Sequence, residues 1–178
     1  MKIKTFHDLF HSQLASIYGA AFNEAIVLPC LRRAASSPEL RAALEEDYAM
    51  ASAQADRLSQ LMPAAPDDAH VPTSIENLSR SSLMLGKYED LSNDARDSAL
   101  IDLVRRLRHD QIAALSTART WARAMRDTEA VSILEDCLRE EKQSDERLEA
   151  IGDQCCRRAI SCCERCMGEN FCGQVAHA

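Results

Sequence analysis

Apolar residues recur every three or four positions along most of the chain, the spacing that places them on one face of an α-helix. The first such stripe runs from Leu9 to Leu31. Thr5 and Asp8 precede it with the spacing of a capping box, in which both side chains meet backbone N–H groups of the first helical turn. We therefore predict a helix that begins near Thr5. We expect Pro29 to kink this helix or end it early, because proline lacks the backbone donor.

A second helix is predicted directly after the first. Ser37 supplies a capping hydroxyl, and Pro38 takes the first helical position, where its missing N–H costs nothing. The apolar stripe that follows ends near Met62. Residues 63–73 contain three prolines and no periodicity, which predicts a crossover loop. The pattern over residues 74–90 predicts a shorter helix within this long connection.

Two more long helices complete the pattern. Asn93 can cap the first, whose apolar stripe reaches Met125, and the second runs from the break at Asp127-Thr128 to Ile151. The low counts of glycine and proline, five each, and the 4% aromatic content suit helix packing better than a sheet. Four long helices with one long crossover are the connectivity of an all-α, ferritin-like four-helix bundle. We assign residues 1–152 to the bundle and 153–178 to a cysteine-rich tail, expected to be partly helical.

The charge of the chain excludes some classes of function. The net charge is −7 and the isoelectric point is about 5.2, whereas nucleic-acid-binding proteins present a basic surface. No continuous apolar segment follows the N-terminal lysines, and we find no stretch that approaches the roughly 18 apolar residues of a membrane span. We therefore expect a cytoplasmic protein without a nucleic-acid or membrane partner, in which the eight cysteines stay reduced.

Several stretches of the predicted helices resemble the YciE/YciF ferritin-like family of bacterial stress-associated proteins. In order along the chain they are MKIKTFHDLF, IYGA, SSPELRAALEE, RDSALID, RHDQIAALSTAR and LREEKQSDERL. The resemblance implies a ferritin-like bundle, commonly dimeric, with a carboxylate-rich dimetal site between the helices. A homodimer and an association with stress are expectations that rest on this resemblance.

The expected metal ligands are mostly missing from this sequence. A dimetal site in such a bundle needs about four inward acidic side chains and one or two histidines. The first helix has Ala21 where the resemblance implies a glutamate, and the second helix, from Asp47 to Ser52, lacks the paired carboxylates. In the third long helix, Arg108 and Gln111 stand where the family has acids.

By this comparison the last helix alone keeps its acids, at Glu140, Glu141 and Asp145. We therefore expect no di-iron centre, no cofactor in the bundle and no enzymatic activity. A guanidinium near the vacant site would repel a divalent cation and could pair with a carboxylate. We hypothesise that Arg108 reaches Glu141 or Asp145 and takes over the electrostatic role of the missing metal. The alternative is an Arg108 that lies on the solvent-exposed surface.

Six of the eight cysteines lie within eighteen residues of the tail, at Cys155, Cys156, Cys162, Cys163, Cys166 and Cys172. On a helix, spacings of seven and four residues would align the first, third and fifth of them along one edge. Gly168 is expected to end that helix, with an irregular end after it. Because soft thiolates select zinc or copper(I), one expectation is a thiolate site for zinc or copper, with either His177 or another tail cysteine as the fourth zinc ligand.

The cysteines leave other interpretations open. Disulfides or redox sensing between the cysteine pairs are a second expectation for the tail, and a tail without specific chemistry is a third. Cys30 and Cys137 lie on apolar helix stripes and are expected to be small core residues.

The sequence thus leaves two functions open. The first is a non-catalytic, stress-associated bundle that acts through interaction with an unidentified protein partner. The second is a thiolate metal-binding or redox-sensing protein that works through its tail. A working di-iron oxidase is disfavoured because too few inward acids are expected.

Overall fold

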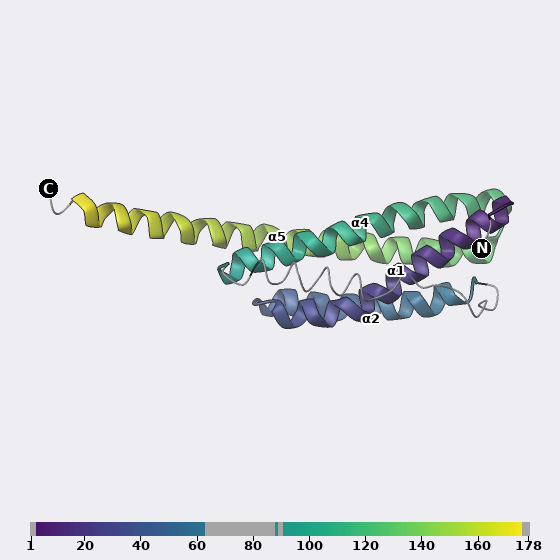
Figure 1. The fold of residues 1–178 in the computed structure, drawn as a ribbon, viewed down its shortest axis with the longest axis horizontal. Coiled ribbons are helices and arrows are strands. Elements are labelled where there is room, and N and C mark those ends of the chain that lie inside the picture. Colours follow the sequence, from purple (N-terminus) through teal and green to yellow (C-terminus); the bar gives the residue numbers. More distant parts are fainter. Residues whose placement is uncertain (1–2, 63–87, 89–90, 176–178) are drawn as a thin grey trace.

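The structure is a computed structural model that describes residues 3–62, 88 and 91–175, with side chains up to residue 162. Four long helices make up this part of the chain: α1 (Phe6–Ala34), α2 (Pro38–Ser59), α4 (Asn93–Met125) and α5 (Thr128–Val175). α1 and α2 form one hairpin and α4 and α5 form the other (Figure 1). The hairpins pack together through α2 with α5 and α1 with α4. This is the four-helix bundle predicted from the sequence, whose crossover loop and short helix at 63–90 lie outside the described residues, apart from Tyr88.

The N-terminal ends of the first two helices form as their sequences predict. The Thr5 hydroxyl accepts a hydrogen bond from the Asp8 N–H at 3.1 Å, and the Asp8 carboxylate accepts one from the Thr5 N–H at 2.9 Å. The Ser37 hydroxyl accepts from the Leu40 N–H at 3.1 Å, with proline at the next position. The expectation that Pro29 could end α1 early is wrong. The helix continues to Ala34, because buried leucines on either side of the proline hold this turn against the core.

α1 corrects a second expectation. By length and composition alone it could cross a membrane, since an 18-residue window of it has a mean hydropathy of 1.4. Half of that window is buried inside the bundle. A helix with one face in a bundle core meets the same two criteria, so its apolar character is explained by packing.

The turn between α1 and α2 is fastened to α4 by a buried carboxylate. Asp97, only 1% exposed, accepts hydrogen bonds from the backbone N–H groups of Ser36 and Ser37, each at 2.7 Å. The break predicted between α4 and α5 is also present. Arg126 ends α4 in the left-handed conformation, with a φ of 61°, and the Asp127 side chain accepts from the Ala130 N–H at 3.0 Å.

α5 passes through the boundary drawn at residue 152 without interruption. It extends well beyond the other helices, as the yellow end of the ribbon shows (Figure 1). Its helical backbone reaches Val175, so the expectation that Gly168 ends the helix is wrong. The first residues beyond the boundary belong to the bundle, since Cys155 packs in the core and Arg158 pairs with Asp94 at 2.7 Å.

The apolar core consists of two clusters. The first joins the early part of α1 to the end of α2, the second half of α4 and the start of α5, and it includes Phe10, Leu14, Leu58, Leu115 and Leu134. The second joins the end of α1 to the start of α2, the start of α4 and the middle of α5, and it includes Leu31, Leu44, Leu100, Val104 and Leu148. Polar side chains occupy the interior where α1, α4 and α5 pass from one cluster to the other.

Candidate functional site: a buried charge centre

One charged residue from each helix joins a group in the middle of the bundle, apart from the buried Asp97 near the start of α4. These residues are Glu24 on α1, Asp47 on α2, Arg108 on α4 and Glu141 on α5, and we call them the buried charge centre. Their exposed fractions are 6% for Glu24 and 0% for the other three. Each follows the core spacing of its own helix, in which inward positions recur alternately every three and four residues. The pattern that buries the leucines therefore buries these charges as well.

Arg108 lies at the middle of this centre. Its Nη2 atom is 3.0 Å from Glu24 Oε1 and 3.0 Å from Asp47 Oδ2, and its Nη1 atom is 2.5 Å from Glu141 Oε2. One guanidinium thus pairs with carboxylates from three helices. The hypothesised contact with Glu141 is present, and the alternative of a surface arginine is wrong because the side chain is 0% exposed.

Asp145, the other proposed partner of Arg108, lies elsewhere. Its carboxylate accepts a hydrogen bond from Arg105 Nε at 2.9 Å and is 3.0 Å from His109 Nε2. Hydrogen bonding from Arg105 is the largest cause of the lowered pKa of Asp145. Asp145 therefore belongs to a half-buried ion pair between α4 and α5, outside the centre.

A second arginine reaches the centre from the surface. Arg147 on α5 has a side chain that is 38% exposed, yet its Nη2 atom is 2.7 Å from Asp47 Oδ1. Its other terminal nitrogen pairs with the exposed Glu46. The Ser144 hydroxyl donates to the same Asp47 oxygen. Asp47 is therefore held by two guanidiniums and one hydroxyl.

Burial changes the protonation of the two glutamates. It raises the pKa of Glu24 from 4.5 to about 8, against the opposing effect of Arg108 and with support from the neighbouring Glu141 and Asp47 charges. Burial also raises the pKa of Glu141, again opposed by Arg108. For Arg108, burial works to lower the pKa, but Glu24, Glu141 and Asp47 outweigh it and the pKa is raised. A proton on Glu24 at neutral pH removes one negative charge from the side chains that face the Arg108 guanidinium.

The expectation that the last helix alone keeps inward acids is wrong. Glu24 lies one helical turn after Ala21, where the family comparison sought a glutamate, and Asp47 heads the segment from which the carboxylates were thought lost. The signal that could have found them is their place in the apolar stripes, with Glu24 between Ala21 and Leu28. An acid at such an inward position must find a partner, because an unpaired buried charge is very costly.

The carboxylates of the centre do not suit a dimetal site as they stand. Three converge from three helices, as such a site requires, but a guanidinium fills the space between them and opposes a divalent cation. Gln111, also inward, donates to the Ile17 carbonyl at 3.2 Å. Among residues 3–62, 88 and 91–162, no group of three or more histidine, cysteine or acidic side chains is arranged to hold a metal ion. The three carboxylates around Arg108 therefore do not fit a di-iron centre.

The structure separates the cysteines that it describes. Cys137 and Cys155 are fully buried, whereas Cys156 and Cys162 are exposed, and Cys30 is half-buried beside Arg33. Burial raises the pKa of Cys137 to about 12 and also raises that of Cys155. Cys155 is thus a core residue and does not share an exposed edge with Cys162. The side chains of Cys163, Cys166, Cys172 and His177 lie outside the described residues.

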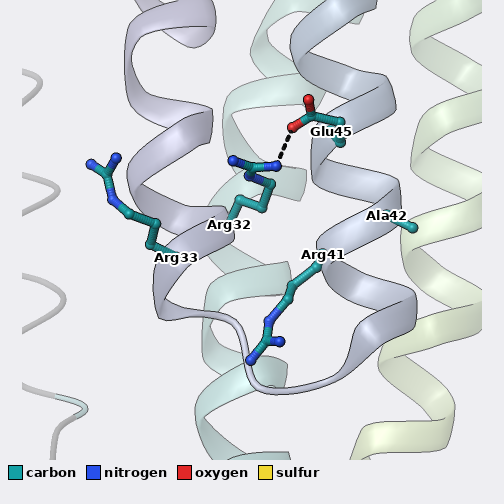
Figure 2. A pocket seen from close by; sticks show the side chains of 5 residues that line it. All are labelled: Arg32, Arg33, Arg41, Ala42 and Glu45. Atoms are coloured by element: carbon teal, nitrogen blue, oxygen red, sulfur yellow. Dashed lines mark ion pairs between the residues drawn. The ribbon is translucent and has the colours of Figure 1, made fainter.

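A cluster of arginines lies at the turn between α1 and α2 (Figure 2). Arg32, Arg33 and Arg41 line an open surface hollow of about 470 Å³. Arg32 pairs with Glu45 at 2.8 Å, Arg41 donates to the Ala35 carbonyl at 2.8 Å, and Arg33 donates to Cys30 and points away from the other two. Each guanidinium has a partner within the chain, so this cluster is explained as support for the turn.

Comparisons with known proteins agree with this architecture. Protein YciF of Escherichia coli strain K12 is 27% identical over 156 residues, which cover 83% of this chain and 90% of YciF. The crystal structure of the E. coli stress protein YciF superposes with a TM-score of 0.76 at 23% identity, over 87% of this chain and 99% of that one. YcfI from Rhodopseudomonas palustris has a TM-score of 0.72 at 23% identity, over 83% of this chain and 95% of that one.

The likeness to these structures confirms the all-α, ferritin-like bundle. A family model described as "Domain of unknown function (DUF892)" matches residues 5–161, from the N-terminal capping box to the region just past the bundle. The chain therefore belongs to the DUF892 family of YciF-like proteins, as the resemblance of its helices indicated.

Proposed function

We propose that this protein is a non-catalytic bundle of the YciF-like family that acts through protein interaction, in which Arg108 has replaced the dimetal centre. The single observation that carries the proposal is the pairing of the fully buried Arg108 guanidinium with Glu24, Asp47 and Glu141. A metal ion in such a bundle would draw the carboxylates of facing helices together. Here a side chain does so permanently, without redox chemistry.

This replacement favours a scaffold over an enzyme. Arg108 neutralises acids that would otherwise repel one another inside the bundle, and it fixes the relative positions of α1, α2, α4 and α5. Breaking a buried pair of this kind is strongly destabilising, although the pair itself adds little net stability. We therefore assign Arg108 a structural role that ties four helices at one level.

The interaction surface that we propose lies on the outer sides of α1 and α4. Phe22 and Leu107 expose 43% and 42% of their surface, and Tyr18 stacks on Phe22 with ring centroids 6.3 Å apart. α1 and α4 pack against each other in the bundle. A second copy of the chain is the partner we expect first, in a cytoplasmic homodimer.

Metal analysis tests the central claim. The full chain, with its tail cysteines replaced by serine so that thiolates do not contribute, is incubated with ferrous iron without oxygen and then desalted. We expect far less than one iron per chain and no acceleration of ferrous oxidation when oxygen is admitted. Two irons per chain with rapid oxidation would overturn the proposal.

Light scattering after size exclusion tests the interaction. The wild-type chain should elute with the mass of a dimer, and Phe22→Asp should shift it towards the monomer, because a charge would be placed in the proposed contact. Phe6→Asp serves as the control on the same helix, since Phe6 is 47% exposed and packs on Trp121 within its own chain. A wild-type monomer would contradict the proposed dimer.

Thiolate metal binding by the tail is a second candidate, favoured by the exposure of Cys156 and Cys162 on a helix that continues past the bundle. Cys162 and Cys166 are four residues apart in the sequence, a spacing at which one helix can offer two thiolates to one metal ion. Zinc takes four ligands, so one such pair is half of a zinc site. We therefore expect about one zinc per two chains if the tail binds zinc, with tails of two copies sharing the ion. Zinc analysis of the reduced protein, against a Cys162→Ser/Cys166→Ser variant, tests this stoichiometry.

A further inference from the structure

We propose that Arg108 and Arg147 form a two-cation centre bridged by Asp47, in which Arg147 keeps divalent cations away from the solvent-facing side of Asp47. The inference rests on the proposed function, since Arg108 fills the inner half of the centre. It extends that function by adding a second cation, Arg147. The Arg147 side chain occupies a space beside Asp47 that could otherwise bind a divalent metal ion through oxygen ligands.

The two oxygens of Asp47 divide between the two guanidiniums. Oδ2 is 3.0 Å from Arg108 Nη2, and Oδ1 is 2.7 Å from Arg147 Nη2. A carboxylate that gives one oxygen to each of two cations is a bridging ligand. Asp47 itself is 0% exposed, so each of its two oxygens faces a guanidinium inside the protein.

Arg147 connects this bridge to the surface. Its side chain is 38% exposed, and it also pairs with Glu46, which is 64% exposed. A continuous series of ion pairs therefore runs from Glu46 through Arg147 and Asp47 to Arg108. Arg147 is the member of the series that touches both a solvent-exposed acid and the buried one.

Without the Arg147 charge, three oxygen groups would face the same space. They are the Asp47 and Glu46 carboxylates and the Ser144 hydroxyl, all of which the structure places beside the Arg147 side chain. Carboxylate and hydroxyl oxygens suit hard cations such as Mg²⁺, Ca²⁺ and Mn²⁺. The Arg147 guanidinium thus occupies, from the solvent side, the space in which these oxygens could bind a cation.

The test measures Mn²⁺ binding by electron paramagnetic resonance in full-length, reduced variants at neutral pH. The variants are R108Q, R147Q and the double variant R108Q/R147Q, beside the wild type. The matched control is R108Q/R139Q, because Arg139 lies on the same helix and pairs only with the exposed Asp136 among the described residues. Mn²⁺ is the probe because it prefers oxygen ligands to thiolates.

We expect no stoichiometric Mn²⁺ on the wild type and weak binding to R108Q. Binding to R108Q/R147Q should be tighter than to R108Q/R139Q by roughly tenfold or more, because a cation beside Asp47 no longer faces a guanidinium. Equal affinities of these two double variants would overturn the role of Arg147. Stoichiometric Mn²⁺ on the wild type would instead overturn the proposed function, so the two failures are distinguishable.

A second comparison keeps Arg108 in place, in case R108Q does not fold. R147Q should bind Mn²⁺ roughly tenfold or more tightly than R147K, which keeps the positive charge at the same position. Both substitutions shorten the side chain and remove the guanidinium. Equal binding by R147Q and R147K would therefore overturn the inference even though both proteins fold.

Discussion

Replacing Glu24 by glutamine removes a buried carboxyl group whose pKa is raised by folding. The pKa of Glu24 is 4.5 in the unfolded chain and about 8 in the bundle, where burial is the largest cause of the increase. At a pH between these two pKa values, Glu24 is protonated in the folded protein and ionised in the unfolded chain. The free energy of unfolding must therefore fall as the pH rises through this window.

The size of the effect follows from one proton per molecule. The slope is about 1.4 kcal/mol per pH unit, so Glu24 lowers the free energy of unfolding by up to about 2.7 kcal/mol between about pH 5.5 and pH 7.5. That is a large part of the 5–15 kcal/mol by which domains are commonly stable. In Glu24→Gln the amide oxygen still accepts from Arg108, and this part of the pH dependence disappears.

Urea unfolding followed by circular dichroism at several pH values in that window measures the difference. We expect the free energy of unfolding to fall more steeply with rising pH for the wild type than for Glu24→Gln. The two slopes should differ by nearly the value for one proton, about 1.4 kcal/mol per pH unit. Glu146→Gln is the control, because Glu146 is an exposed acid on α5. Parallel pH profiles for the wild type and Glu24→Gln would refute the reasoning that Glu24 carries a proton inside the folded bundle.

Three further predictions follow from the core and the helix ends. Arg108→Ala should lower the free energy of unfolding by about 3–5 kcal/mol in urea titrations, because three buried acids lose their partner. Millimolar guanidinium chloride should recover part of that loss where sodium chloride does not; a variant as stable as the wild type would contradict the centre. Cys137, buried with a pKa of about 12, should react with iodoacetamide far more slowly than the exposed Cys156 when each site is followed by mass spectrometry; equal rates would show that the core opens readily. Arg126→Gly should raise the free energy of unfolding by about 1 kcal/mol, because it relieves a left-handed residue with a φ of 61°. Arg123→Gly, inside α4, should lower it by about the same amount, and thermal unfolding of both variants checks the opposite signs.

Local signals in the sequence determined the helices and most of their ends. The Thr5–Asp8 capping box and the Ser37-Pro38 start formed as expected, since their hydrogen bonds join residues three positions apart. The alternation of inward positions every three and four residues determined which faces are buried. Pro29 does not end α1, because local propensity is weak compared with the packing of a whole helix face.

The family resemblance indicated Glu141 as one of two possible partners of Arg108, but only the tertiary structure decided between them and added Glu24 and Asp47. Arg108 meets Glu141, Asp47 and Glu24 across separations of 33, 61 and 84 residues along the chain. No periodic pattern encodes which acid faces which base, because that depends on how far each helix is shifted and rotated against its neighbours. The family resemblance pointed to Ala21 as the position of the acid, one helical turn before Glu24. Residues one turn apart lie on the same face of a helix but at different levels of the bundle. The sequence could thus place charges on inward faces, while the packing of four helices brought them to one point.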